Sequence, residues 1–72
     1  MIYDYSSLLG RITEKCKTQA IFAKKMGLSE HSISRKLNNI VPFKQYEITK
    51  ASVILEIPQN ELAHYFFKIV VQ

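Results

Sequence analysis

Apolar residues along the chain recur mainly at the three- and four-residue spacing of α-helices, so the pattern predicts a mainly helical protein. The first such stripe falls at i, i+3, i+4, i+7 and i+11, and consists of Tyr5, Leu8, Leu9, Ile12 and Cys16. These positions share one face of a helix, which we expect to be buried. Asp4 stands just before the stripe, where its side chain can cap the helix N-terminus.

A second, shorter helix is predicted after residue 18. Thr18 can cap its N-terminus, and Gly27 permits the left-handed backbone conformation that ends a helix sharply. Between them, the side chains expected to be buried are Phe22, Ala23 and Met26. The pattern therefore indicates a helix of about two turns followed by a tight corner.

A third helix should begin directly after that corner. Ser29 can cap it, and Leu28 and Ile33 have the spacing of a hydrophobic staple, which fixes the angle at which the chain enters the helix. Ile33 and Leu37 are expected to face inward. The outward face then carries Glu30, His31, Ser34 and Arg35. This face holds one acid, one histidine and one base, which makes it the first candidate for a binding surface.

Two further helices are predicted in the second half of the chain. Asn38 or Asn39 must take the left-handed position that ends the third helix, because no glycine follows it. Pro42 interrupts the chain before a fourth helix, whose apolar stripe is Ile48, Ala51 and Leu55. Pro58 suits the first turn of a fifth helix, whose apolar residues are Leu62, Tyr65 and Phe66.

The last residues have a different pattern. Phe67, Ile69 and Val71 alternate with Lys68 and Val70, and most of them are β-branched or aromatic. The pattern fits a short strand as well as a frayed helix end or extended tail. A lone strand cannot satisfy its own backbone groups, so a strand here would suggest pairing with another chain.

Composition narrows the range of functions. The 72 residues are enough for one small domain, spanning residues 1–72, and contain a single cysteine, which excludes an internal disulfide and favours a reducing cytoplasm. The two histidines are far apart in sequence, so no metal site is expected, and no apolar run approaches the roughly 18 residues needed to span a membrane. Glycine-rich phosphate loops, Ser/His/Asp sets and paired carboxylates are absent. We therefore expect neither an enzyme nor a cofactor.

Charge is distributed unevenly along the chain. Residues 11–50 contain nine Lys and Arg residues against three Glu residues, whereas residues 51–72 contain one Lys against two Glu. The middle of the chain, with a local charge of +6, is thus the part suited to a polyanion such as nucleic acid, although solvated surfaces of this composition are common.

A specific spacing adds to this picture. Gln19, Ala23, Gly27, Ile33 and Leu37 have the arrangement of a helix-turn-helix: a small residue where two helices cross, a glycine at the turn and apolar residues that seat the second helix. The segments YDYSSLLGRI, AIFAKKMGLSEHSISRKLNN, VPFKQYEI and IPQNELAHYFF together resemble small Cro-like regulators of temperate phages and prophages of Gram-positive bacteria, a group that includes modulators of repression. The resemblance covers nearly the whole chain. It implies an all-α, five-helix, lambda-repressor-like domain with its helix-turn-helix at residues 18–38.

The resemblance also implies roles for individual residues. The positions that would read base edges in the major groove are Glu30, His31, Ser32, Ser34 and Arg35. The positions that would contact phosphates are Thr18, Gln19, Lys24, Lys25, Lys36, Asn38 and Lys44. For each lysine, a solvated position without any contact explains the sequence equally well.

Two features depart from a DNA reader. Glu30 places a negative charge near phosphates, which suits DNA only if the carboxylate accepts a hydrogen bond from a cytosine. The segment after the third helix contains Ile40, Val41 and Phe43 instead of basic residues. If exposed, these side chains would form a patch beside Arg35 suited to a protein partner; alternatively, two of the three fill the core under the fourth helix.

Two functions therefore remain open. The first is a Cro-like transcriptional regulator of the lysis-lysogeny switch that binds operator DNA in the host cytoplasm, as a homodimer formed through residues 53–71. The second is an antirepressor, or modulator of repression, that binds the DNA-binding domain of the phage repressor. Its surface would consist of Arg35, Ile40, Val41 and Phe43 on and beside the third helix.

Overall fold

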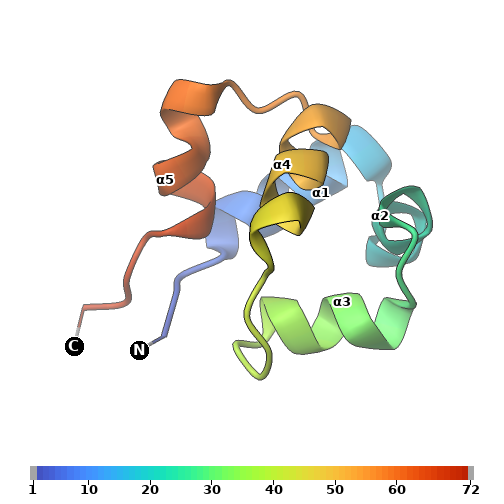
Figure 1. Ribbon diagram of the computed structural model, residues 1–72, viewed down its shortest axis with the longest axis horizontal. Coiled ribbons are helices and arrows are strands. Elements are labelled where there is room, and N and C mark those ends of the chain that lie inside the picture. Colours follow the sequence, from blue (N-terminus) through green and yellow to red (C-terminus); the bar gives the residue numbers. More distant parts are fainter. Residues whose placement is uncertain (1, 72) are drawn as a thin grey trace.

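Five α-helices make up most of the computed structural model, which describes residues 2–71 (Figure 1). The elements are α1 (Ser6–Cys16), α2 (Gln19–Met26), α3 (Glu30–Leu37), α4 (Gln45–Ile54), the 3₁₀ turn η1 (Gln59–Glu61) and α5 (Leu62–Phe66). Within the described residues there is one isolated β-bridge and no sheet. The all-α, five-helix fold predicted from the sequence is confirmed.

The core lies where α1, α2 and α4 meet, with α3 and α5 covering two sides of it (Figure 1). The largest side chains with almost no exposed surface are Leu8, Ile12, Phe22, Ile33, Leu55 and Phe66. They come from α1, α2, α3, α5 and the residue that directly follows α4, and Ala51 of α4 is also fully buried, so every helix contributes to a single core. Removing any of them would be expected to cost several kcal/mol, about 2–5, in a domain of this size.

The buried face of α1 contains fewer residues than the sequence pattern predicted. Leu8, Ile12 and Cys16 are buried, but Leu9 is 37% exposed. The reason is that α1 contacts α2 and α5, and the row of positions i, i+4 and i+8 faces that contact. Leu9 lies about 100° further round the helix and reaches the surface instead.

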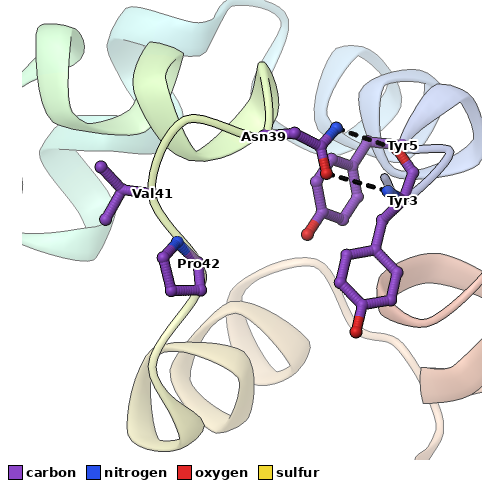
Figure 2. Close-up of a pocket in the computed structure, with 5 residues that line it drawn as sticks. All are labelled: Tyr3, Tyr5, Asn39, Val41 and Pro42. Atoms are coloured by element: carbon purple, nitrogen blue, oxygen red, sulfur yellow. Dashed lines mark hydrogen bonds between the residues drawn. The ribbon is translucent and has the colours of Figure 1, made fainter. Parts of the chain in front are cut away.

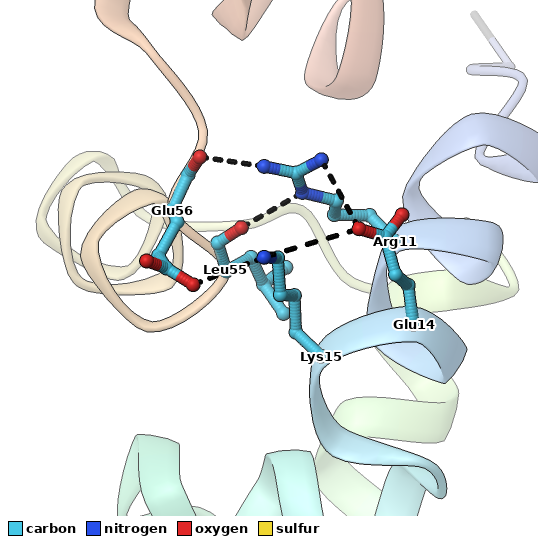
Figure 3. A network of polar contacts seen from close by, with 5 residues as sticks. All are labelled: Arg11, Glu14, Lys15, Leu55 and Glu56. Atoms are coloured by element: carbon cyan, nitrogen blue, oxygen red, sulfur yellow. Dashed lines mark hydrogen bonds and ion pairs between the residues drawn. The ribbon is translucent and has the colours of Figure 1, made fainter.

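The end of α4 is fastened to α1 by a group of polar contacts (Figure 3). The Arg11 side chain donates from Nε to the Leu55 carbonyl at 2.8 Å and from Nη2 to the Glu56 carbonyl at 2.6 Å. Lys15 pairs with the Glu56 carboxylate at 3.0 Å. The last turn of α4 is closed by the chain itself, since Glu56 is left-handed and the Ile57 amide donates to the Ser52 carbonyl at 2.8 Å. Arg11 therefore binds the carbonyls that follow this turn and joins the end of α4 to α1.

The two ends of the described chain run side by side (Figure 1). Tyr3 and Ile69 form an antiparallel bridge, in which the Asp4 amide donates to the Lys68 carbonyl at 2.6 Å and the Val70 amide donates to the Ile2 carbonyl at 3.0 Å. The suggestion that an extended tail would pair with another chain is thus corrected. The segment before α1 supplies the partner, and the sequence pattern of the tail alone could not indicate this.

Candidate functional site

The corner between α2 and α3 has the local geometry expected for residues 18–38. Gly27 adopts a left-handed conformation with φ of 73°, and its amide donates to the Lys24 carbonyl at 3.1 Å. The hydroxyl of Thr18 accepts from the Ile21 amide, and that of Ser29 accepts from the Ser32 amide. Both helices therefore begin at the predicted caps, and the direction of α3 is fixed from both sides of the turn.

One face of α3 points away from the protein. Ile33 is fully buried and Leu37 is 8% exposed, which anchors the inner face. The residues on the opposite side are Glu30, His31, Ser34, Arg35 and Asn38, of which Ser34 is half-buried and the others are exposed. Ser32 is half-buried at the border of this face. The name α3 face is used below for Glu30, His31, Ser34, Arg35 and Asn38. This face contains most of the residues predicted to read bases.

Several side chains near the α3 face are already partnered, and others are free. The Asn38 amide donates to the Ser34 carbonyl at 2.8 Å, which holds Asn38 against the helix end. Arg35 is exposed, and within residues 2–71 its guanidinium makes no hydrogen bond or ion pair. Lys24 and Lys25 are exposed on α2. The Arg35 guanidinium is therefore the positive group on α3 that remains free to meet a ligand.

The prediction that Lys36 contacts phosphate is wrong. Its side chain is buried, where its ammonium lies 3.0 Å from the Glu47 carboxylate and donates to the Pro42 carbonyl at 3.3 Å. The reason is its direction, because Lys36 follows Arg35 by one residue and faces the start of α4 instead of solvent. The ion pair thus joins α3 to α4 and closes the segment between them.

The same contacts determine the charge state of Glu47. Burial on its own would raise the pKa of this carboxyl group, but the hydrogen bond from the Lys44 amide and the adjacent Lys36 ammonium together lower it below its ordinary value. The carboxylate therefore stays ionised inside the protein. The contact between the Glu47 carboxylate and the Lys36 side chain holds the first turn of α4 and the end of α3 at a fixed distance.

The segment between α3 and α4, residues 39–43, is also bonded to the N-terminal segment that precedes α1 (Figure 2). Asn39 takes the left-handed position with φ of 62°, one of the two positions predicted for it. Its side-chain oxygen accepts from the Tyr3 amide at 2.9 Å, and its side-chain nitrogen donates to the Tyr3 carbonyl at 3.0 Å. The Asn39 amide thus occupies both backbone groups on the outer edge of Tyr3, as a neighbouring strand would.

The three apolar residues of this segment differ in how far they are buried. Ile40 is 60% exposed and Val41 is half-buried. Phe43 is half-buried and packs against the core, where its ring lies edge-on to the rings of Tyr5 and Phe66, with centroid distances of 5.6 and 5.4 Å. The Phe43 ring thus contacts the aromatic core, which leaves Ile40 as the more exposed apolar side chain of the segment, and contact of Phe43 with a partner stays a prediction.

Two features of this region were missed by sequence reasoning. Tyr46, in the first turn of α4, is 65% exposed. It does not belong to the apolar stripe of Ala51 and Leu55, and this position outside the stripe could have identified it as an exposed aromatic residue. A pocket of about 150 Å³ is lined by Tyr3, Tyr5, Asn39, Val41 and Pro42 (Figure 2). Its walls come from segments 36 residues apart, so no local pattern could have indicated it.

Thr18 and Lys44 are exposed and Gln19 is half-buried, and the Thr18 hydroxyl is engaged as a helix cap. In residues 53–71, exposed apolar side chains are Val53, Phe67, Ile69, Val70 and Val71, and the homodimer contact expected there stays a prediction. Among residues 2–71 there is no cluster of three or more metal-ligating side chains, and none of the helices has the length and apolar character required to cross a membrane.

Comparisons with known proteins found one protein family and a similar solved structure. A protein-family model described as "Protein of unknown function (DUF739)" matches residues 1–69. No curated protein sequence matches the chain. Among solved structures, the chain is similar to the solution structure of the modulator of repression of the temperate bacteriophage TP901-1 from Lactococcus lactis, at 54% identity and a TM-score of 0.83, over 97% of each chain.

Proposed function

The chain belongs to the DUF739 family, and on this basis, together with its similarity to a phage modulator of repression, we propose that it modulates the repressor of a temperate phage. The observation that carries the proposal is the 54% identity to that modulator over nearly the full length of both chains. The protein acts in the cytoplasm of the bacterial host, where the repressor holds its operator. Its partner is the DNA-binding domain of that repressor.

The surface proposed for this contact consists of the α3 face and the exposed part of residues 39–43. A repressor must present positive charge to DNA phosphates, so a protein that covers the same region gains from neutral or acidic side chains. Glu30 supplies an acidic group, and Ile40, with 60% of its surface exposed, supplies apolar area. Protein interfaces are depleted of charge at their centre and enriched in apolar and aromatic side chains, which matches this segment.

The segment is also well suited to binding because it is held in place before any partner arrives. The Asn39 side chain bonds both backbone groups of Tyr3, and Lys36 bonds the Pro42 carbonyl. Little conformational entropy is then lost on association, which leaves more of the interaction energy as affinity. The contacts that hold the loop thus favour binding of a protein partner.

A mobility-shift titration tests the proposal. The operator fragment is first bound by the repressor that the same phage encodes, and the chain is then added in increasing amounts. We expect the repressor's shift to be lost or altered, while the chain alone leaves the fragment unshifted at the same concentration. An unchanged repressor shift at a large excess of the chain would contradict the proposal.

A second candidate is operator binding by the chain itself, and the free guanidinium of Arg35 on the α3 face is the observation that favours it. A Cro-like regulator would need a two-fold dimer through residues 53–71 to read both half-sites. Fewer basic groups are free than the sequence suggested, since Lys36, Arg11 and Lys15 are committed to contacts within the chain. This candidate would be favoured if the chain alone shifted the operator fragment and Arg35→Ala reduced the free energy of DNA binding by about 1–3 kcal/mol.

A further inference from the structure

The two ends of the chain form a short antiparallel ribbon. The name terminal ribbon is used below for residues 2–4 and 67–71, which run side by side (Figure 1). Two backbone hydrogen bonds flank the bridged pair of Tyr3 and Ile69, and neither bond uses a backbone group of these two residues. The N–H and C=O groups of Tyr3 and Ile69 therefore point away from each other, toward the two outer edges of the ribbon.

Only one of these edges is covered. The Asn39 side chain bonds both backbone groups of Tyr3, at 2.9 and 3.0 Å, and so occupies the first edge. At the opposite edge, the N–H and C=O groups of Ile69 make no hydrogen bond within residues 2–71. An open edge is a template for a further strand, which is why proteins commonly cover it. The terminal ribbon can thus accept one more strand, beside Ile69.

The side chains along the open edge are apolar. Strand alternation places them on both faces of the terminal ribbon. The exposed ones, with between 41% and 91% of their surface exposed, are Ile2, Phe67, Ile69, Val70 and Val71. A group of exposed apolar side chains marks an interaction site, whereas single ones are ordinary. An added strand would therefore cover apolar surface as well as the free backbone groups.

Charge distinguishes between the candidate occupants of this edge. The terminal ribbon contains one acid and one base, Asp4 and Lys68, whose charged groups lie 3.9 Å apart, so its net charge is zero. The whole chain carries a net charge of +4. Two copies of a basic protein repel each other least where their surfaces are neutral. A basic DNA-binding domain, by contrast, gains no electrostatic attraction from a neutral ribbon.

We propose that a second copy of this chain pairs with the open edge, antiparallel and with Ile69 opposite Ile69 of the second copy. Each Ile69 amide then donates to the Ile69 carbonyl of the other copy, around a two-fold axis. In this register Lys68 lies opposite Val70 of the second copy, so no like charges face each other. The result is a four-stranded antiparallel sheet whose two outer edges are both covered by Asn39 side chains.

The pairing is expected to be weak. A stable interface buries at least about 1,000 Å² in total, and two paired strands of about five residues bury less than that. We therefore expect a Kd of roughly 0.1–1 mM for the dimer. The chain is then monomeric at micromolar concentration and mainly dimeric at a few millimolar.

The wild-type chain alone provides the first test. Its amide spectrum and hydrogen exchange are recorded by NMR between about 0.02 and about 2 mM, with sedimentation equilibrium over the same range. We expect the Ile69 amide to shift with concentration and its exchange to slow at least about twofold, because pairing supplies the acceptor that it lacks in the monomer. The Lys25 amide, inside α2, should stay constant.

Two outcomes of this series would overturn the proposal. The first is an Ile69 amide that does not respond to concentration up to about 2 mM. The second is an Ile69 amide that responds only when the purified repressor domain is added, which would assign the edge to the repressor. Neither outcome bears on the proposed function, because the proposed contact surface for the repressor is the α3 face and the exposed part of residues 39–43.

A pair of variants tests the two-fold register. Ile69→Lys and Ile69→Glu each place like charges opposite one another, so each variant alone should remain monomeric at about 2 mM. An equimolar mixture should associate again, with a Kd within about tenfold of wild type, because lysine then faces glutamate. The controls Val53→Lys and Val53→Glu, at a residue of α4 that is 74% exposed, should each associate as wild type does.

Circular dichroism first establishes that all four variants are folded. A mixture of folded Ile69→Lys and Ile69→Glu that stays monomeric would overturn the proposal, and so would either variant that dimerises alone as strongly as wild type. If a variant at position 69 fails to fold, the concentration series of the wild-type chain decides the question without it.

Discussion

The ammonium of Lys36 lies 3.0 Å from the carboxylate of Glu47, and both side chains are almost completely buried. This pair joins the last turn of α3 to the first turn of α4, and the segment that carries Ile40 and the pocket lies between them. Lys36, which the sequence analysis assigned to phosphate contact, is therefore an internal residue that holds the proposed contact surface in place. The contribution of Lys36 is therefore measured first as a change in the free energy of unfolding, and afterwards as a change in binding affinity.

Lys36→Met should lower the free energy of unfolding by about 3 kcal/mol, because it leaves the Glu47 carboxylate buried without its cationic partner. Urea unfolding followed by circular dichroism measures the change. The control Lys24→Met, at an exposed lysine of α2, should stay within about 0.5 kcal/mol of wild type. Similar values for the two variants would show that the pair is not buried in solution.

Stability should depend on pH through Glu47. Its pKa in the folded protein is depressed, so its contribution to stability is fully present above the ordinary glutamate value of 4.5 and is lost as pH falls through the lower folded-state value. Melting temperatures of wild type and Glu47→Gln, measured between pH 7 and pH 2, should therefore differ most at neutral pH and converge in acid. A constant difference across this range would be inconsistent with the depressed pKa.

Substitutions at Asn39 should separate its two roles. Asn39→Gly keeps the left-handed backbone but loses both bonds to Tyr3, at a cost of about 1–2 kcal/mol in unfolding free energy. Asn39→Ala loses the same bonds and adds a strained backbone, for about 1 kcal/mol more. Urea titrations of both variants measure this order. If alanine proved as stable as glycine, φ at this position would not be positive in solution.

Lys17 also has a positive φ, of 72°, directly after α1. Lys17→Gly should raise the free energy of unfolding by about 1 kcal/mol, because glycine adopts this conformation without strain. The matched control Lys24→Gly, inside α2, should lower it by about 1 kcal/mol. Thermal unfolding of the two variants distinguishes these opposite signs, and a loss of stability in Lys17→Gly would refute the backbone assignment.

Ile40→Asp should weaken binding of the repressor domain by at least about tenfold, because it places a carboxylate on the apolar part of the proposed surface. Folding stability should change little, since Ile40 is 60% exposed. The control Val53→Asp introduces the same charge at an exposed apolar residue of α4, and its Kd should match wild type. Calorimetry with the three proteins measures the difference, and equal Kd values throughout would remove Ile40 from the contact.

Much of the fold and part of the site could be predicted from the sequence. Thr18, Gly27 and Ser29 act within one helical turn of their own position, so their roles as caps and turn were readable from spacing alone. The outward direction of His31 and Arg35 followed from the inward direction of Ile33 on the same helix. These are local relationships, and helical geometry fixes them without knowledge of the rest of the protein.

The remaining features depended on partners far away in the sequence. Lys24 and Lys36 look alike as isolated basic residues on helices, but one is solvated and the other is buried against Glu47, because only Lys36 faces the start of α4. Phe43 and Ile40 are both apolar loop residues, and only the positions of the Tyr5 and Phe66 rings decide which of them is enclosed.

The sequence by itself thus determined the helices, the corner at residues 18–38 and the outward face of α3, because spacing and caps act over a few residues. The tertiary structure alone decided which charges are free, that the tail pairs with Tyr3, and that Tyr3 and Tyr5 line a pocket together with residues 39–42. The physical reason is that periodicity defines which side of a helix is buried but not which neighbour buries it. The binding surface proposed here is built from such distant contacts.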